Sequence, residues 1–103
     1  MAVPLTTDTE RCVSRLFAES ERAEAARLLQ DECANNLPFL EKADAAGLER
    51  FRFAALKVSG GDLRKLEEAV AVAQQDWRDL LVAAGFANRL DAHRQWFSTE
   101  VDG

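Results

Sequence analysis

The residue types that most often carry enzyme chemistry are scarce in this chain. Its 103 residues include one histidine, His93, and two cysteines, Cys12 and Cys33. A zinc or di-iron site needs several histidine, cysteine or carboxylate ligands that converge in space. These three residues lie far apart and form neither a Cys-x-x-Cys nor a Glu-x-x-His motif. The sequence therefore predicts no metal site and no cofactor, and it predicts two buried free thiols.

The single histidine also restricts nucleophilic catalysis. A serine or cysteine nucleophile needs a base, usually a histidine that a third group orients, so any such site would depend on His93. Ser59 has glycine neighbours but lacks the strand before it that a nucleophile elbow requires. The carboxylate pairs Asp31-Glu32 and Glu67-Glu68 are adjacent on expected helices and point about 100° apart. We predict no catalytic residues.

Two weaker polar groupings remain. If the chain holds a small-molecule pocket between helices, its polar members would be His93, Arg52 and Asp79, although no spacing joins them. Arg50, Arg52 and Lys57 form the one local basic cluster, which we interpret as a solvated helix face. With 13 Lys and Arg against 18 Asp and Glu, the net charge is −5, so nucleic-acid binding is the least favoured class.

The elements that must position these residues are expected to be helices throughout. A capping box of Thr7 and Glu10 predicts a helix from about residue 8, and apolar spacing predicts further helices over about 21–34 and about 44–58. The turn Ser59-Gly60-Gly61-Asp62 ends the third helix and caps the next. Gly85-Phe86 predicts a Schellman-type stop, and Asn88 is the expected cap of a short last helix.

The strongest pattern is a heptad seam between these two stops. Apolar residues repeat at spacings of three and four, which predicts one helix over about 63–84. The seam consists of Leu63, Leu66, Val70, Ala73, Trp77, Leu80 and Ala84. We therefore predict an all-α fold, a compact bundle of four to five helices with this long helix at its centre. The chain is expected to be one helical domain, 1–103, with frayed ends at 1–6 and 99–103.

No run of the sequence reaches the eighteen or more apolar residues of a membrane span, and the first residues lack the basic start of a secretory signal. These features predict a cytoplasmic protein that does not cross a membrane.

Aromatic residues suggest the most specific functional hypothesis. Core packing is the first interpretation of the aromatic residues, and the alternative is an interaction surface, for which the candidates are Trp77, Trp96, Phe97 and Leu81. The first hypothesis is a non-enzymatic protein-interaction or regulatory module that binds a protein partner or a second copy of itself. The alternative is a small enzyme or ligand carrier with a pocket between helices, and nucleic-acid binding comes third.

Three segments carry a resemblance. The run Asp76–Phe86 (DWRDLLVAAGF), the turn Ser59–Leu63 (SGGDL) and the segment Asn36–Pro38 (NLP), together with Leu48–Phe51, resemble a group of small bacterial proteins that have no assigned activity. The resemblance covers most of the chain. It implies an all-helical cytoplasmic bacterial protein, and it supplies no catalytic or ligand-binding residues.

Overall fold

The helices pack around α3 (Ala45–Ser59), which the sequence makes apolar on nearly every side. In this computed structural model, which describes residues 2–38, 40 and 42–102, Leu48 and every residue from 51 to 56 are buried. A helix buried all round is a core helix. The Asp44 side chain accepts a hydrogen bond from the Gly47 N–H at 2.9 Å, and Gly60 ends the helix in the left-handed conformation. Both ends lie within a residue or two of the positions that the sequence predicts.

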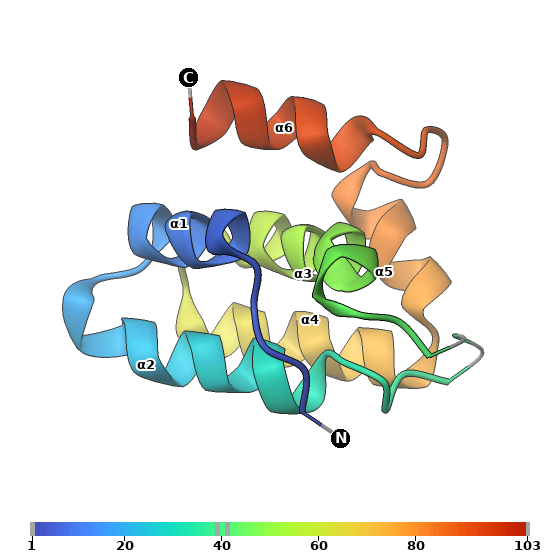
Figure 1. Cartoon of the computed structure of the whole chain (residues 1–103), viewed down its shortest axis with the longest axis horizontal. Coiled ribbons are helices and arrows are strands. Elements are labelled where there is room, and N and C mark those ends of the chain that lie inside the picture. The colour runs from blue at the N-terminus through green and yellow to red at the C-terminus, as the bar shows by residue number, and fades with distance from the viewer. Residues whose placement is uncertain (1, 39, 41, 103) are drawn as a thin grey trace.

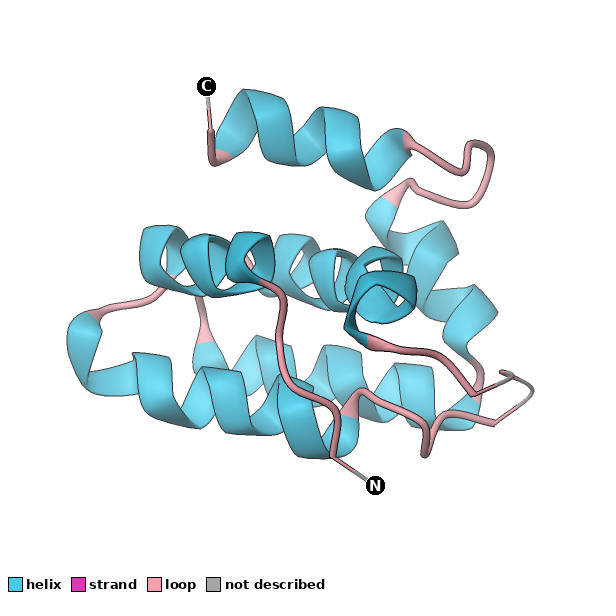
Figure 2. Cartoon of the chain, viewed as in Figure 1, coloured by secondary structure: helices cyan, strands magenta, loops and turns pink. Residues whose placement is uncertain are grey.

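The other helices surround α3 on several levels (Figure 1). In that view α1 (Thr7–Leu16) lies level with α3, α2 (Glu19–Arg27) and α4 (Leu63–Gln75) lie below, and α6 (Ala92–Glu100) lies above. The short helix α5 (Trp77–Ala84) stands at one edge and leads from the lower level to the upper one. The described residues form six α-helices and one π-helical turn, without a strand (Figure 2). The all-α prediction is confirmed.

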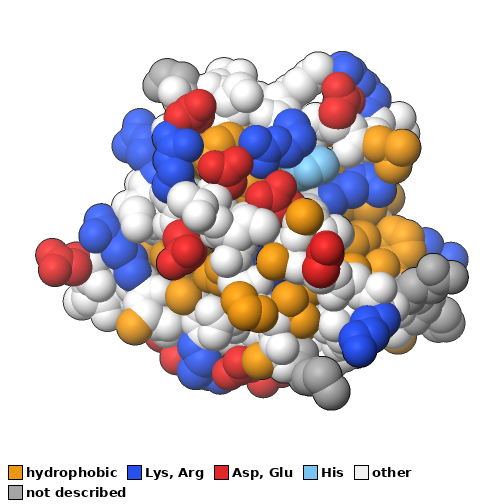
Figure 3. Space-filling model, in the orientation of Figure 1, with side chains coloured by type: hydrophobic (Ala, Val, Ile, Leu, Met, Phe, Trp, Pro, Cys, Tyr) orange, Lys and Arg blue, Asp and Glu red, His pale blue; other side chains and the backbone are white. Residues whose placement is uncertain are grey.

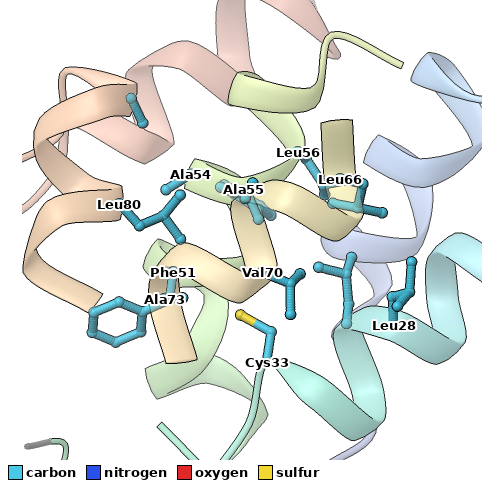
Figure 4. Close-up of a cluster of buried hydrophobic side chains, with 14 of the residues drawn as sticks. Leu28, Cys33, Phe51, Ala54, Ala55, Leu56, Leu66, Val70, Ala73 and Leu80 are labelled. Carbon is cyan, nitrogen blue, oxygen red and sulfur yellow. The ribbon is translucent and has the colours of Figure 1, made fainter. Parts of the chain in front are cut away.

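The core is continuous from α1 through α3 to α4 and α5. The buried cluster in Figure 4 joins Leu66 and Val70 of α4, Ala54 of α3 and Leu80 of α5. The predicted buried thiols are confirmed, because Cys12 and Cys33 are free and 0% exposed. Burial raises the pKa of each thiol to about 12, since a thiolate loses its hydration there.

The long helix predicted over 63–84 is two helices, and the central helix is α3 instead. Asp76 takes an extended conformation (φ −164°, ψ 109°) and ends α4. Its carboxylate accepts a hydrogen bond from the Arg78 N–H at 3.0 Å and so caps α5. The break leaves the burial pattern intact. Five of the seven seam residues are buried, namely Leu66, Val70, Ala73, Leu80 and Ala84.

Several predicted helix ends shift for local reasons. Thr6 rather than Thr7 caps α1, because its hydroxyl accepts the Thr9 N–H. The helix expected over 21–34 begins at Glu19 and finishes in the π-helical turn η1 (Leu28–Glu32). Asp91 rather than Asn88 precedes α6. At the expected frayed ends, α6 continues to Glu100, and hydrogen bonds join the Val3 carbonyl and the Thr6 hydroxyl to side chains of α3. Met1 and Gly103, the outermost residues of these ends, lie outside the described residues.

Arg52 is the charged residue at the heart of this arrangement. Its side chain is 0% exposed, and it donates hydrogen bonds to the carbonyls of Cys33 (3.0 Å), Pro4 (2.9 Å) and Val3 (2.7 Å). Burial lowers its pKa from the usual value, yet a guanidinium stays protonated. The interpretation of Arg52 as part of a solvated face is wrong. The residue joins the first residues of the chain and the end of η1 to the central helix.

We expect Arg52→Met to destabilise the fold by about 2–4 kcal/mol, because the buried Cys33 carbonyl loses its donor and the Val3 and Pro4 carbonyls lose their attachment to α3. Urea unfolding followed by circular dichroism measures the change. Arg64→Met is the matched control, since the Arg64 side chain is 90% exposed and its loss should change stability by less than about 0.5 kcal/mol. Equal effects of the two substitutions would contradict the role of Arg52.

Candidate functional site

A groove beside α5 combines exposed apolar side chains with polar ones. Its volume is about 310 Å³. It is lined by Arg50 of α3, by Trp77, Arg78, Leu81 and Val82 of α5, and by Ala87 and Leu90 of the segment that follows. We call it the α5 groove. Hydrophobic side chains gather over this part of the molecule, next to Lys and Arg side chains (Figure 3).

The segment after α5 is fixed by a Schellman motif. Gly85 has φ +78°, which favours glycine. The Phe86 N–H donates to the Leu81 carbonyl at 2.9 Å and the Gly85 N–H to the Val82 carbonyl at 3.1 Å. Phe86 is 1% exposed and anchors the turn in the core. The predicted stop is confirmed, and it places residues 87–90 beside α5.

Two cations of α3 hold the same segment. Lys57 Nζ donates to the Ala84 carbonyl at 2.8 Å, and Arg50 Nη2 donates to the Phe86 carbonyl at 2.8 Å. Lys57 Nζ also lies 5.0 Å from the centre of the Phe86 ring. A cation at the end of a helix satisfies carbonyls that lack a partner within the helix. These contacts therefore fix the end of α5 and the turn after it to α3.

Two N–H donors in the groove have no acceptor. Arg50 Nε and Trp77 Nε1 are both buried and make no hydrogen bond. The Trp77 ring is held by an edge-on contact with Phe51, with ring centres 5.2 Å apart. A buried donor without a partner costs on the order of 1–3 kcal/mol, and native proteins keep few of them. An acceptor group would relieve this cost once the side chains that cover the two nitrogens move aside.

The apolar side of the groove is exposed. Val82 is 68% exposed and Leu90 is 80% exposed. Neither residue is among the site residues that the sequence predicts. Val82 lies outside the heptad seam, and Leu90 is an apolar residue in a polar stretch. These features indicate a shared surface only once the structure places residues 87–90 beside α5.

The four residues predicted as an interaction surface do not form one surface. Trp77 and Leu81 line the α5 groove, although Leu81 is only 3% exposed. Phe97 is 2% exposed and stacks on Phe53 with ring centres 5.2 Å apart, so it belongs to the core. Trp96 is half-buried and meets Phe53 edge-on at 6.0 Å. The Phe97 ring is further covered by the guanidinium of Arg94, 5.1 Å from its centre.

The residues considered for a polar pocket are separate. Arg52 faces the Val3 and Cys33 carbonyls, whereas Asp79 is exposed on α5. No hydrogen bond or ion pair in the described residues joins His93, Arg52 or Asp79 to one another. The described part of the chain also contains no group of three or more His, Cys, Asp or Glu residues that could hold a metal ion.

His93 lies instead beside an ion-pair network that joins α1, α3 and α6. Arg94 donates to Glu49 at 3.1 Å and to Asp8 at 2.9 Å. Glu49 also accepts a hydrogen bond from the Thr6 hydroxyl at 2.6 Å. Because the Glu49 side chain is only 14% exposed, removing Arg94 would leave a largely buried carboxylate without its counter-ion, which is costly.

Burial lowers the pKa of His93 from its usual value, and the cations Arg94 and Arg50 lower it further, while Glu49 and the backbone of Leu90 oppose them. The imidazole meets the Phe53 ring edge-on at 5.6 Å, and its Nδ1 is buried without a hydrogen bond. Protonation would therefore place a charge in a poorly hydrated position. The neutral imidazole suits this position as a packing group.

We expect His93 to make the fold less stable in mild acid. Its folded-state pKa lies below the unfolded value of about 6.5, so the unfolded chain binds more protons and stability falls as the pH drops below about 6.5. Urea unfolding at about pH 7.5 and pH 5.5 measures this loss, and His93→Gln should reduce it. The same loss in both proteins would contradict the assignment.

Comparisons of the chain with protein-family models, curated proteins and solved structures return no match. The resemblance to small bacterial proteins stays a prediction. No helix in the described residues is long and apolar enough to cross a membrane.

Proposed function

We propose that this chain is a non-enzymatic protein-interaction module and that the α5 groove is its docking surface. The observation that carries the proposal is the composition of the groove. It holds the two most exposed large apolar residues among those described, Val82 and Leu90, together with two buried donors that lack acceptors. Exposed apolar side chains beside unmet polar groups are typical of a surface that another molecule covers.

The alternative, a small enzyme or ligand carrier, has less support. The groove is at the small end of the 300–1,000 Å³ that ligand pockets span, and its most exposed apolar residues lie at its rim. The candidate polar residues His93, Arg52 and Asp79 make no common contact in the described structure. A docking surface needs neither an enclosed cavity nor a converging catalytic set.

Nucleic-acid binding through the basic cluster also has less support. Arg52 is buried, and the charged groups of Arg50 and Lys57 already donate to backbone carbonyls. Phosphate contacts need basic groups that reach the surface.

We further propose that the protein works in a bacterial cytoplasm. The sequence resemblance supports the bacterial source. The two buried free thiols support a reducing compartment.

We expect Val82→Asp to remove peptide binding. Random peptides displayed on phage and selected on the wild-type protein should include clones that lose about tenfold or more in affinity for Val82→Asp, because a buried carboxylate would oppose apolar contact. Val72→Asp is the matched control, since Val72 is exposed on α4 outside the groove, and it should bind these clones as the wild type does. Selection without enrichment, or clones that bind all three proteins equally, would contradict the proposal.

A further inference from the structure

We infer that the partner is an amphipathic helix that carries an acidic side chain among its apolar residues. This inference rests on the proposed docking function of the α5 groove and adds the chemistry of its occupant. The carboxylate would accept hydrogen bonds from Trp77 Nε1 and Arg50 Nε while the apolar residues cover Val82 and Leu90.

The first argument is the kind of polar group in the groove that lacks a hydrogen-bond partner. Both unpaired groups are N–H donors, so only an acceptor can satisfy them. A lysine or arginine side chain of a partner has donors alone and would leave both N–H groups without an acceptor. An aspartate or glutamate brings two acceptor oxygens, and hydrogen bonds to an ionised acceptor are stronger than those between neutral groups.

The second argument is charge complementarity. The chain as a whole carries −5, yet both charged side chains that line the groove are arginines, Arg50 and Arg78. Arg78 already pairs with Asp76 at 2.7 Å. Arg50 donates to a backbone carbonyl and, in the part of the chain that the structure describes, faces no carboxylate within ion-pair distance. An acidic partner group would therefore supply the charge that Arg50 lacks.

The third argument is the shape of the surface. One wall is a short helix and the other is the segment 87–90, with apolar side chains at the rim. This is the setting in which an amphipathic helix lays its apolar face into a groove. The two donor nitrogens are covered in the free chain, so the Trp77 ring must shift as the carboxylate reaches it. Trp77 fluorescence is consequently a direct reporter of the contact.

The test uses the displayed peptides whose binding depends on Val82. Their shared residues should include Asp or Glu between apolar positions at helical spacing. The Trp96→Phe protein leaves Trp77 as its single tryptophan, because the chain has 2. For the tightest such peptide, replacing the acid with Gln should weaken binding about tenfold, and replacing it with Lys should weaken binding further. The acidic peptide alone should change Trp77 emission strongly.

Each other outcome has a distinct meaning. Groove-dependent peptides without an acidic residue, or equal binding of the Glu, Gln and Lys peptides, would overturn this inference and leave the docking function standing. An absence of groove-dependent peptides would overturn both. If sedimentation shows a wild-type dimer that Val82→Asp disperses and Val72→Asp does not, the occupant is a second copy of the chain, and the acidic-helix inference fails.

Arg50→Lys provides an independent check. Lysine keeps the charge and can still reach a carbonyl, but it lacks the Nε–H of arginine. The advantage of the Glu peptide over the Gln peptide should shrink in this variant. An unchanged advantage would mean that Arg50 Nε does not contact the carboxylate.

Discussion

The structure depends on a buried guanidinium. Arg52 sits in the central helix, out of contact with solvent, and holds carbonyls that lie 19, 48 and 49 residues away in the sequence. Such carbonyls would be costly to bury without a donor. A cation that pairs with neutral acceptors keeps its charge in the interior, and the network is stable because several hydrogen bonds replace its hydration. The path of the first residues and the end of η1 follow from this contact.

Other cations of α3 also donate hydrogen bonds to backbone carbonyls, and they do so next to the candidate site. Lys57 and Arg50 donate to the carbonyls of Ala84 and Phe86, so the end of α5 and the turn after it are fixed to the core by cations. The α5 groove exists because this turn brings residues 87–90 back beside α5. Arg50 holds this turn through Nη2 and also carries, at Nε, one of the two buried donors that lack an acceptor.

The sequence predicts those features of the fold that depend on residues close together in the chain, such as helix ends. Gly60 and Gly85 end helices because their backbones are left-handed, and Asp62 caps α4, as predicted. The break at Asp76 was not predictable from the spacing of apolar residues, since the burial pattern continues through it. The roles of Arg52 and Arg50 depend on backbone carbonyls of segments far away in the sequence. The spacing of residues does not predict which distant carbonyls a side chain will meet. The α5 groove is likewise a product of tertiary packing.

A double-mutant cycle tests the central role of Arg52 most directly. Urea unfolding free energies would be measured for the wild type, for Arg52→Met, for a chain that lacks residues 2–4, and for the combination. If Arg52 stabilises the fold through the Val3 and Pro4 carbonyls, the combined loss should fall short of the sum of the single losses by about 1 kcal/mol or more. Additivity to within about 0.5 kcal/mol would show that the two are energetically independent and would contradict this account.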